Sequence, residues 1–246
     1  MNPFDEEVRD RIADNGRNEA LREAASAFMR ESTQPKYSYN FTWLGRPIIQ
    51  YPQDIVAMQE LIWALQPDLI IETGIAHGGS LVLYASLLEL NAACGGPQDA
   101  RVVGIDIDIR AHNRSAIEAH PMSRRIMMIE GSSVDAAVVA QAREAIGRGD
   151  RVLACLDSNH SHDHVLAELE AYAPLVSIGS YCVVFDTVIE DLPAGTYPDR
   201  PWGPGNNPKT AVHEYLQSHP EFESDGRIDD KLLVTVAPNG YLKRVR

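Results

Sequence analysis

The chain has 246 residues, of which 22 are basic and 35 acidic, and its formal net charge is −13. This length suits one large α/β domain with additions, and the chain has no basic block that would bind nucleic acid or an anionic membrane. The longest apolar runs have the length of strands and the N-terminus is acidic, so we expect neither a membrane span nor a signal peptide, and a cytoplasmic location.

The three cysteines, Cys94, Cys155 and Cys182, are odd in number and lack the paired spacing of metal ligands. Two of them lie inside apolar runs that have the length of strands. We therefore interpret them as core thiols in a reducing compartment and not as a disulfide or a zinc site.

Residues 1–52 are predicted to form an N-terminal helical arm and an aromatic loop, ahead of a core domain at residues 53–246. Residues 1–33 carry apolar side chains at helical spacing, and this arm could cover an edge of the domain, contact another subunit or form part of a substrate wall. The loop at 34–52 contains five aromatic residues: Tyr37, Tyr39, Phe41, Trp43 and Tyr51. They could stack on a flat or sugar ligand, or pack against the core.

From Asp54 onward, apolar runs of strand length alternate with segments of helical periodicity. Pro67 ends the first of these helices. The strands are expected at 69–74, 102–107, 126–130, 152–157 and 180–186, and the helices between them at 80–91, 112–119, 134–147 and 163–173. This alternation predicts a parallel sheet with helices on both faces and right-handed crossovers.

After the fifth strand the alternation stops at Val188–Asn207, a segment with four prolines, three glycines and Trp202. A loop this long inside a compact domain is usually functional, and we expect a lid. A helix follows from Pro208. Near the C-terminus, Pro238-Asn239-Gly240 joins two strand-like runs and predicts a hairpin. The expected total is seven strands, five parallel and the last two antiparallel.

The segment Leu69–Ser80 reads as a strand, a glycine turn and the start of a helix. Gly74, Gly78 and Gly79 allow the backbone to approach a ligand closely, and the helix start offers free N–H groups. The glycine spacing does not fit the dinucleotide fingerprint Gly-x-Gly-x-x-Gly. Asp106 ends the next strand, where an acid can bind ribose hydroxyls. A plain strand-to-helix turn with an exposed acid is the alternative.

Every predicted parallel strand ends in an acidic residue, and ligands of such sheets lie at the carboxyl ends of the strands. These acids are Glu72, Asp106, Glu130 (followed by Ser132 and Ser133), Asp157 and Asp186 (followed by Thr187). A strand-end acid is also a common helix N-cap, so one alone indicates little. Five at one edge of a sheet indicate a binding site.

Asp157 and Asp186 end the fourth and fifth strands and should project side by side. Two carboxylates, with Thr187 or waters completing the shell, suit Mg²⁺. His160, three residues after Asp157, is placed to act as a general base, although a loop histidine that binds backbone is equally consistent with the pattern. A metal site made only of histidines is disfavoured, because His160, His162 and His164 cannot all face one ion if a helix starts near residue 163.

With these residues in view, the sequence resembles the cephalosporin hydroxylase and rhamnosyl O-methyltransferase family, over roughly residues 40–215. The shared motifs are Trp43-x-Gly45-x-Pro47, Pro67-Asp68, Glu72-x-Gly74, Gly78-Gly79-Ser80, Gly104-x-Asp106, Leu156-Asp157-Ser158, His164-Val165-x-x-Glu168-Leu169, Gly179-x-Tyr181 and Asp186-Thr187. The resemblance implies the Rossmann-like class I methyltransferase fold, with seven strands of which the last two form an antiparallel hairpin, and S-adenosylmethionine as the cofactor.

The resemblance also implies roles for individual residues. It places Glu72, Gly74 and Gly78 around the methionine part of the cofactor and Asp106 at the ribose. The full set expected to bind the cofactor is Glu72, Gly74, Gly78, Ser80, Asp106, Ser133 and Asp157. A divalent cation, Mg²⁺ or another, is implied at Asp157, Asp186 and Thr187, with His160 and Asp157 as the catalytic residues. Some relatives carry Glu just before the second metal acid, where this chain has Phe185, so the third protein ligand stays open.

The activity implied is Mg²⁺-dependent transfer of a methyl group to a hydroxyl of a rhamnose-type sugar, carried by a glycoside, a nucleotide sugar or a natural product. The expected partner is a small glycosylated substrate, and the family and the arm together suggest a homo-oligomer. The alternatives are a hydroxylase or its accessory protein, a non-catalytic cofactor-binding protein, and a nicotinamide dehydrogenase, which the glycine spacing disfavours.

Overall fold

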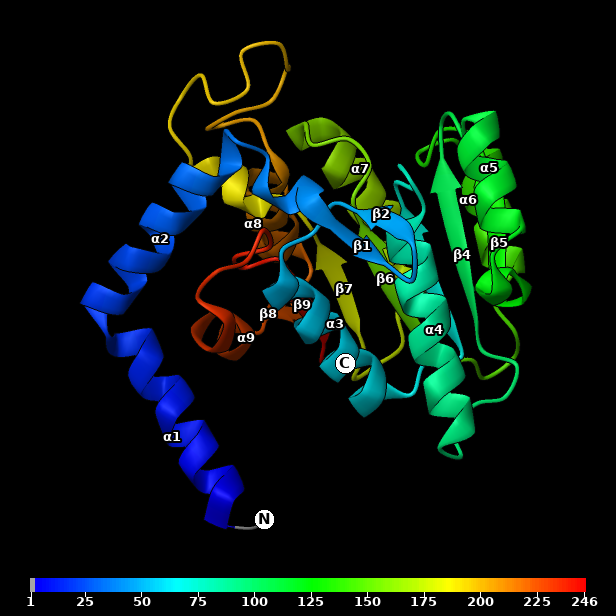
Figure 1. The fold of residues 1–246 in the computed structure, drawn as a ribbon, viewed down its shortest axis with the longest axis horizontal. Helices are drawn as coiled ribbons and strands as arrows, with labels where there is room; N and C mark the ends of the chain where they lie inside the picture. The colour runs from blue at the N-terminus through cyan, green and yellow to red at the C-terminus, as the bar shows by residue number, and fades with distance from the viewer. Residues whose placement is uncertain (1–2) are drawn as a thin grey trace.

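A seven-stranded mixed sheet forms the centre of the protein, as the computed structural model of residues 3–246 shows (Figure 1). Its strand order is β5-β4-β3-β6-β7-β9-β8. The parallel strands are β3 (Leu69–Thr73), β4 (Arg101–Asp106), β5 (Ile126–Glu130), β6 (Val152–Leu156) and β7 (Tyr181–Val184). The last two are β8 (Phe222–Ser224) and β9 (Tyr241–Arg244), and β9 pairs antiparallel with both β7 and β8. The predicted fold class is therefore confirmed.

Helices cover both faces of this sheet. They are α3 (Pro52–Leu65), α4 (Gly79–Ala93), α5 (Ala111–Glu118), α6 (Ala136–Glu144), α7 (His162–Tyr172), α8 (Pro208–Ser218) and α9 (Gly226–Leu232). Successive residues of a strand point to opposite faces, so Ile70 packs into the core under α3 and α4 while Leu69 and Ile71 pack into the core under α6, α7 and α8. None of the described helices is long and apolar enough to cross a membrane.

The prediction of a C-terminal hairpin is correct for the strand after Gly240 and wrong for the strand before Pro238. The run before Pro238 is not a strand: α9 ends at Leu232, and an irregular segment follows. The buried carboxylate of Asp54 accepts hydrogen bonds from the backbone N–H of Val236 at 3.0 Å and from the Thr235 hydroxyl. Because these bonds fix the segment on α3, the partner of β9 comes instead from β8, which carried no strong sequence signal.

The N-terminal arm consists of α1 (Pro3–Arg17) and α2 (Glu19–Thr33), which Figure 1 shows in dark blue along one side of the domain. α1 lies against α9, and at Gly16 an added Cβ would lie 2.3 Å from the Asp230 carboxyl. The segment after α2 forms a short hairpin, β1 (Phe41–Trp43) and β2 (Arg46–Ile48), which the sequence did not indicate.

Most of the aromatic loop packs inward. The ring of Tyr37 lies 5.5 Å from the rings of Phe28 and Tyr51 and 5.2 Å from that of Phe41. Tyr39 differs, because it is exposed and lines the cavity at the strand ends. The loop therefore packs on the core and also contributes two aromatic residues to the cavity lining, the exposed Tyr39 and the buried Tyr51.

Candidate active site

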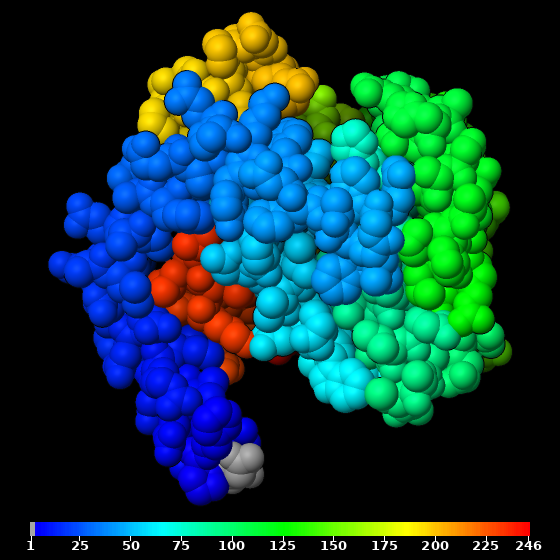
Figure 2. Space-filling view, viewed as in Figure 1, coloured from blue at the N-terminus to red at the C-terminus, as the bar shows by residue number. Residues whose placement is uncertain are grey.

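A cavity of about 750 Å³ opens at the carboxyl ends of the parallel strands. One side is lined by the glycine turn after β3 and by the ends of β4 and β5, and the other by the lid, the end of α2 and the aromatic loop. In Figure 2 the lid (gold) and the aromatic loop (blue) lie next to each other at the top of the molecule. Seven residues predicted to be functional line this cavity: Gly74, Ser80, Asp106, Ser133, Asp157, His160 and Asp186.

The glycine turn brings β3 and β6 into close contact. Gly74 has φ +89°, and a Cβ there would lie 2.0 Å from the carbonyl oxygen of Asp157. Gly78 has φ +80°, precedes the first turn of α4 and would place a Cβ 2.4 Å from the Ile117 side chain. No other residue type fits these two positions without moving a neighbour. α4 starts at Gly79 without a side-chain cap, and Gly79 and Ser80 line the cavity, so this wall contains a helix start, where N–H groups lack intrahelical partners.

Glu72 lies behind the wall of the cavity and is fully buried in β3. The Ser80 hydroxyl donates a hydrogen bond to its Oε2 at 2.9 Å, whereas its Oε1 has no hydrogen-bond partner among the described residues. Burial raises the pKa of Glu72 to about 8. An unpartnered carboxylate oxygen is costly to bury, and a cationic ligand beside it would offset this cost. The residue therefore fits a cofactor that carries positive charge.

Asp106 connects the end of β4 to the glycine turn. Its Oδ2 accepts hydrogen bonds from the N–H groups of Ile75 at 2.8 Å and Ala76 at 3.3 Å, and its Oδ1 accepts one from Asp108 at 3.1 Å. The carboxylate lines the cavity and keeps lone pairs free, so it can still accept hydrogen bonds from ligand hydroxyls. Asp106 thus both shapes the turn and faces the cavity.

A polar network that the sequence analysis missed lies between the ends of β5 and β6. The Nε2 atom of His164 is 3.1 Å from the hydroxyl oxygens of both Ser133 and Ser158. The Ser158 hydroxyl also donates a hydrogen bond to Glu168 at 2.6 Å. Glu168 is fully buried on α7, and its second carboxylate oxygen has no partner among the described residues. The His-x-x-x-Glu spacing, one helical turn, was the signal available in the sequence.

Asp157, His160 and Asp186 form a group that can hold a metal ion. One ligand atom from each lies within 4.8 Å of the others, and Nε2 of His160 is 3.1 Å from Oδ2 of Asp186. Burial raises the pKa of Asp157 well above its ordinary value, and the nearby carboxylates of Asp186 and Glu72 raise it further. A cation among these oxygens would favour their charged forms, so the donor set fits a divalent ion.

The three histidines of the run at 160–164 bind different partners. His160 faces Asp186, whereas Nδ1 of His162 is 2.8 Å from the Thr210 hydroxyl and its Nε2 is 3.2 Å from Glu214. His164 belongs to the serine network already described. A metal site made only of these histidines is therefore inconsistent with the structure.

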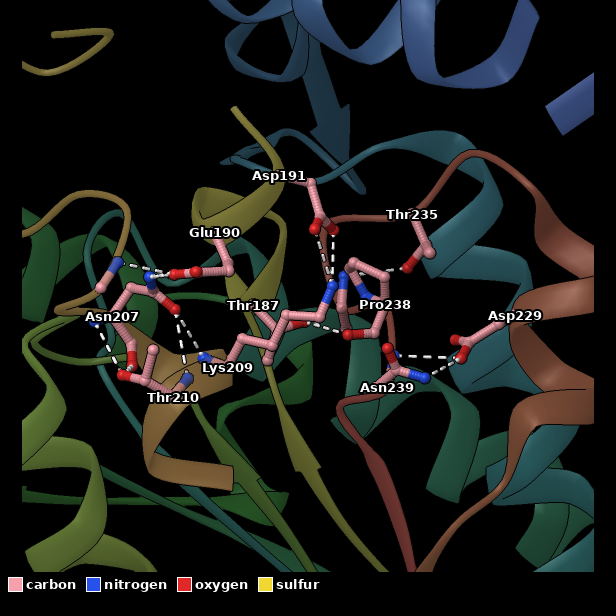
Figure 3. Close-up of polar contacts among 12 residues, drawn as sticks. Thr187, Glu190, Asp191, Asn207, Lys209, Thr210, Asp229, Thr235, Pro238 and Asn239 are labelled. Carbon is pink, nitrogen blue, oxygen red and sulfur yellow. Dashed lines mark hydrogen bonds and ion pairs between the residues drawn. The ribbon is translucent and has the colours of Figure 1, made fainter. Parts of the chain in front are cut away.

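Thr187 does not join the acidic group. It is fully buried in η4 (Thr187–Asp191), its hydroxyl donates a hydrogen bond to the carbonyl oxygen of Pro238 at 2.7 Å, and it does not line the cavity (Figure 3). The reason is the left-handed backbone of Asp186, with φ 57°, which turns the chain directly after the acid. The position predicted for a third ligand is thus occupied by a structural threonine, while Phe185 packs into the core.

The lid is fastened at its base by contacts between its two ends (Figure 3). Oε2 of Glu190 accepts hydrogen bonds from the Gly205 N–H at 2.8 Å and from the side chain of Asn207. Lys209 forms an ion pair with Asp191 at 2.6 Å. Asn207 also caps α8 through the N–H groups of Lys209 and Thr210. Farther along the lid, the rings of Trp202 and His160 meet edge to face at 5.0 Å.

The strand order, with the glycine turn after β3 and the acid that ends β4, is the fold of class I methyltransferases. The model of one family, described as rhamnosyl O-methyltransferase/CmcI, matches residues 35–245. The chain belongs to this family and is an S-adenosylmethionine-dependent O-methyltransferase. The resemblance found in the motifs is thereby confirmed.

Curated relatives include rhamnosyl O-methyltransferases of Mycobacterium. The protein from Mycobacterium bovis (strain BCG / Pasteur 1173P2) is 32% identical over 208 residues, which cover 82% of this chain and 78% of the relative. The one from Mycobacterium leprae is 31% identical and covers 82% of each chain. Among solved structures, CmcI with Mg and SAM has a TM-score of 0.56 at 20% identity and covers 85% of this chain and 78% of its own. TomG from Streptomyces achromogenes, with SAM, has a TM-score of 0.52 at 18% identity and covers 80% and 79%.

Proposed function

We propose that the protein transfers the methyl group of S-adenosylmethionine to a hydroxyl of a rhamnose-type deoxysugar and that a divalent cation assists the transfer. The observation that carries this proposal is the position of Asp157, His160 and Asp186, which lie in the same cavity as the glycine turn and Asp106. The names of the mycobacterial relatives support the choice of a sugar acceptor.

The cofactor is assigned to the side of the cavity formed by β3, β4 and β5. Glu72 and Ser80, with the backbone at Gly74 and Gly78, would surround the methionine part, and the buried carboxylate of Glu72 would compensate positive charge. Asp106 would accept hydrogen bonds from the ribose hydroxyls, and Ser133 would lie at the base. This arrangement uses the unpartnered Oε1 of Glu72 and the free lone pairs of Asp106.

Asp157 and Asp186 would hold the cation, which lowers the pKa of an acceptor hydroxyl when it is bound. Mg²⁺ prefers oxygen ligands, so we assign His160 the role of general base and not of third ligand. Its Nε2 atom lies at the edge of the acidic pair, where an acceptor hydroxyl held by the cation would meet it. The lid would cover the acceptor and exclude water. Alignment of the two reactants can contribute up to roughly 7–11 kcal/mol to lowering the barrier.

Mass spectrometry tests the reaction directly. Incubation with S-adenosylmethionine, Mg²⁺ and a panel of rhamnosides should yield a product heavier by one methylene group, and EDTA should abolish it. A product heavier by one oxygen would instead identify a hydroxylase. The absence of any product would favour a non-catalytic binding protein.

The roles of the acids and of the histidine are separated by two variants. Asp186→Asn should weaken Mg²⁺ binding in calorimetry and lower turnover at least a hundredfold, whereas Asp108→Asn, an exposed acid near the same edge, should change neither. His160→Ala should lower turnover by 10²–10⁴-fold and leave Mg²⁺ affinity unchanged. A loss of metal affinity in His160→Ala would make His160 a ligand and refute its assignment as the base.

A further inference from the structure

Two basic side chains on the acceptor side of the cavity have no acidic partner. Lys36 and Arg200 both line the cavity, and within the described part of the chain neither has a carboxylate oxygen within 4.0 Å. Each lies instead over an aromatic ring: Nζ of Lys36 is 5.5 Å from the centre of Tyr39, and the guanidinium carbon of Arg200 is 5.1 Å from that of Trp202. The same cavity also contains Asp106, Asp157 and Asp186, which are assigned to the cofactor and the metal, so Lys36 and Arg200 are the unpaired cations left to contact an anionic part of a ligand.

The position of Arg200 relative to the acidic group sets the distance to that anion. The centre of the Trp202 ring lies 5.0 Å from the centre of the His160 ring and 5.1 Å from the guanidinium carbon of Arg200. These two contacts to one ring set an upper limit on the distance between the guanidinium and His160. One sugar ring and its first substituent can span this gap, so an anionic group attached to the methylated sugar would reach Arg200.

Both side chains are exposed, but the backbone that carries each of them is constrained before any ligand binds. Lys36 has φ 57° and ψ 48°, a left-handed conformation that costs a non-glycine residue about 1–2 kcal/mol and that occurs preferentially at functional sites. Arg200 belongs to the lid, whose ends are joined through Glu190 and Asn207. Its backbone N–H also donates a hydrogen bond to the carbonyl oxygen of Tyr197 at 3.2 Å. Such preorganisation reduces the entropy lost when a ligand binds.

One acid shares this part of the cavity. Asp199 lines it next to Arg200, but no carboxylate oxygen of Asp199 lies within ion-pair distance of the guanidinium in the described chain. The donors of Arg200 therefore stay free, and the three side chains together carry one positive charge. A guanidinium with free donors binds phosphate in a bidentate manner, and a lysine adds a point charge.

We propose that the acceptor carries an anionic group next to the methylated sugar and that Arg200 and Lys36 bind this group. A nucleoside-diphosphate deoxysugar is the acceptor class that fits best, because its diphosphate is attached directly to the sugar ring and presents oxygens to both cations. This inference rests on the proposed sugar methylation and narrows its substrate class. A glycoside that bears a carboxylate shares the chemistry and is the alternative source of the anion.

Binding of uridine diphosphate and thymidine diphosphate tests the anion site without turnover. The probes are titrated calorimetrically into the protein with S-adenosylhomocysteine and without Mg²⁺, so that the metal group does not contribute. We expect measurable binding that weakens at least tenfold in Arg200→Gln and in Lys36→Gln and is partly retained in Arg200→Lys. Arg148→Gln, an exposed arginine outside the cavity, should bind like the wild type. Failure of the wild type to bind either probe would overturn the diphosphate assignment.

Turnover with three acceptors separates this inference from the proposed function. The acceptors are a nucleoside-diphosphate rhamnose, a neutral methyl rhamnoside and a rhamnoside bearing a carboxylate. We expect the diphosphate sugar to have the highest kcat/KM and Arg200→Gln to remove this preference, mainly through KM. Preference for the carboxylate would keep the anion site but replace its ligand. Equal turnover of the neutral glycoside would overturn the inference, and methylation of none of the three would refute the sugar methylation itself while the binding result stands.

Discussion

The α-carbon of Gly74 lies so close to Asp157 that a Cβ at Gly74 would stand 2.0 Å from the Asp157 carbonyl oxygen. This contact joins the turn assigned to the cofactor to the strand end assigned to the metal. A side chain at residue 74 would therefore disturb both halves of the site at once.

Gly74→Ala should abolish binding of S-adenosylhomocysteine and lower the free energy of unfolding by more than the roughly 1–2 kcal/mol that a positive φ alone costs. Gly149→Ala is the matched control, because Gly149 has φ +88° and nothing within 4 Å of its added Cβ. Calorimetry and thermal unfolding check both variants. Equal destabilisation of the two would show that the contact with Asp157 has no consequence.

The raised pKa of Glu72 should make the free energy of unfolding of the cofactor-free protein depend on pH. The pKa of Glu72 in the folded chain is about 8, against an ordinary value of 4.5, so between these values the folded state binds the extra proton. The free energy of unfolding should therefore be highest below pH 4.5 as far as this group contributes, and should fall as pH rises towards 8, by an amount on the order of a few kcal/mol.

Glu72→Gln keeps the shape of this side chain without the titration. The variant should lose the part of the pH dependence between about pH 5 and 8 that denaturant titrations reveal in the wild type, and it should bind S-adenosylmethionine more weakly because the compensating charge is gone. An unchanged slope of stability against pH would contradict the assignment of that slope to Glu72.

The hydrogen bonds of Asp54 should stabilise the C-terminal segment. Its buried carboxylate binds Val236, Thr235 and Tyr241, and burial raises its pKa to about 6. Asp54→Ala should cost about 3–5 kcal/mol, because it leaves three buried donors without a partner. Thr235→Val removes one of these bonds and should cost about 1–2 kcal/mol. Urea unfolding measures both, and similar losses would contradict the expectation that the bonds to Asp54 contribute separately.

Loss of the helix cap at Asn207 should affect the lid, whereas loss of the cap at Asn18 should not. Asn207 caps α8 and binds Glu190 at the base of the lid, whereas Asn18 caps α2 through the Leu21 N–H at 3.1 Å and lies far along the chain from the lid. Alanine at either position should cost about 1 kcal/mol of stability. Only Asn207→Ala should raise KM for the acceptor and speed proteolysis between residues 192 and 206. Equal protease sensitivity of the two variants would exclude the role in the lid.

The parallel sheet and the meeting of Asp157 with Asp186 could be predicted from the sequence, because both follow from local rules. Apolar runs mark β6 and β7, and adjacent parallel strands place the residues that follow them at one edge. Residues 231–236 could not be predicted in this way, because their strand-like pattern is overridden by hydrogen bonds from Thr235 and Val236 to Asp54, which lies 181 and 182 positions earlier. Local patterns carry no information about such a distant partner.

The site likewise contains some residues whose positions follow from local patterns and others whose positions depend on distant contacts. The positions of Asp106 and Ser80 follow from strand ends and the glycine turn, whereas the network of Ser133, His164 and Glu168 depends on how α7 packs across two strands. The failure of Thr187 as a ligand has a similar origin. Its hydroxyl binds Pro238, which approaches only once β9 has entered the sheet.

The closed base of the lid has a consequence for redesign. Glu190 and Asn207 join the two ends of this loop by hydrogen bonds. The distance that the loop can extend over the cavity is therefore set by the number of residues between its ends. Shortening or lengthening residues 193–199 would thus tune the size of acceptor that can be accommodated, while the metal group and the cofactor wall stay untouched.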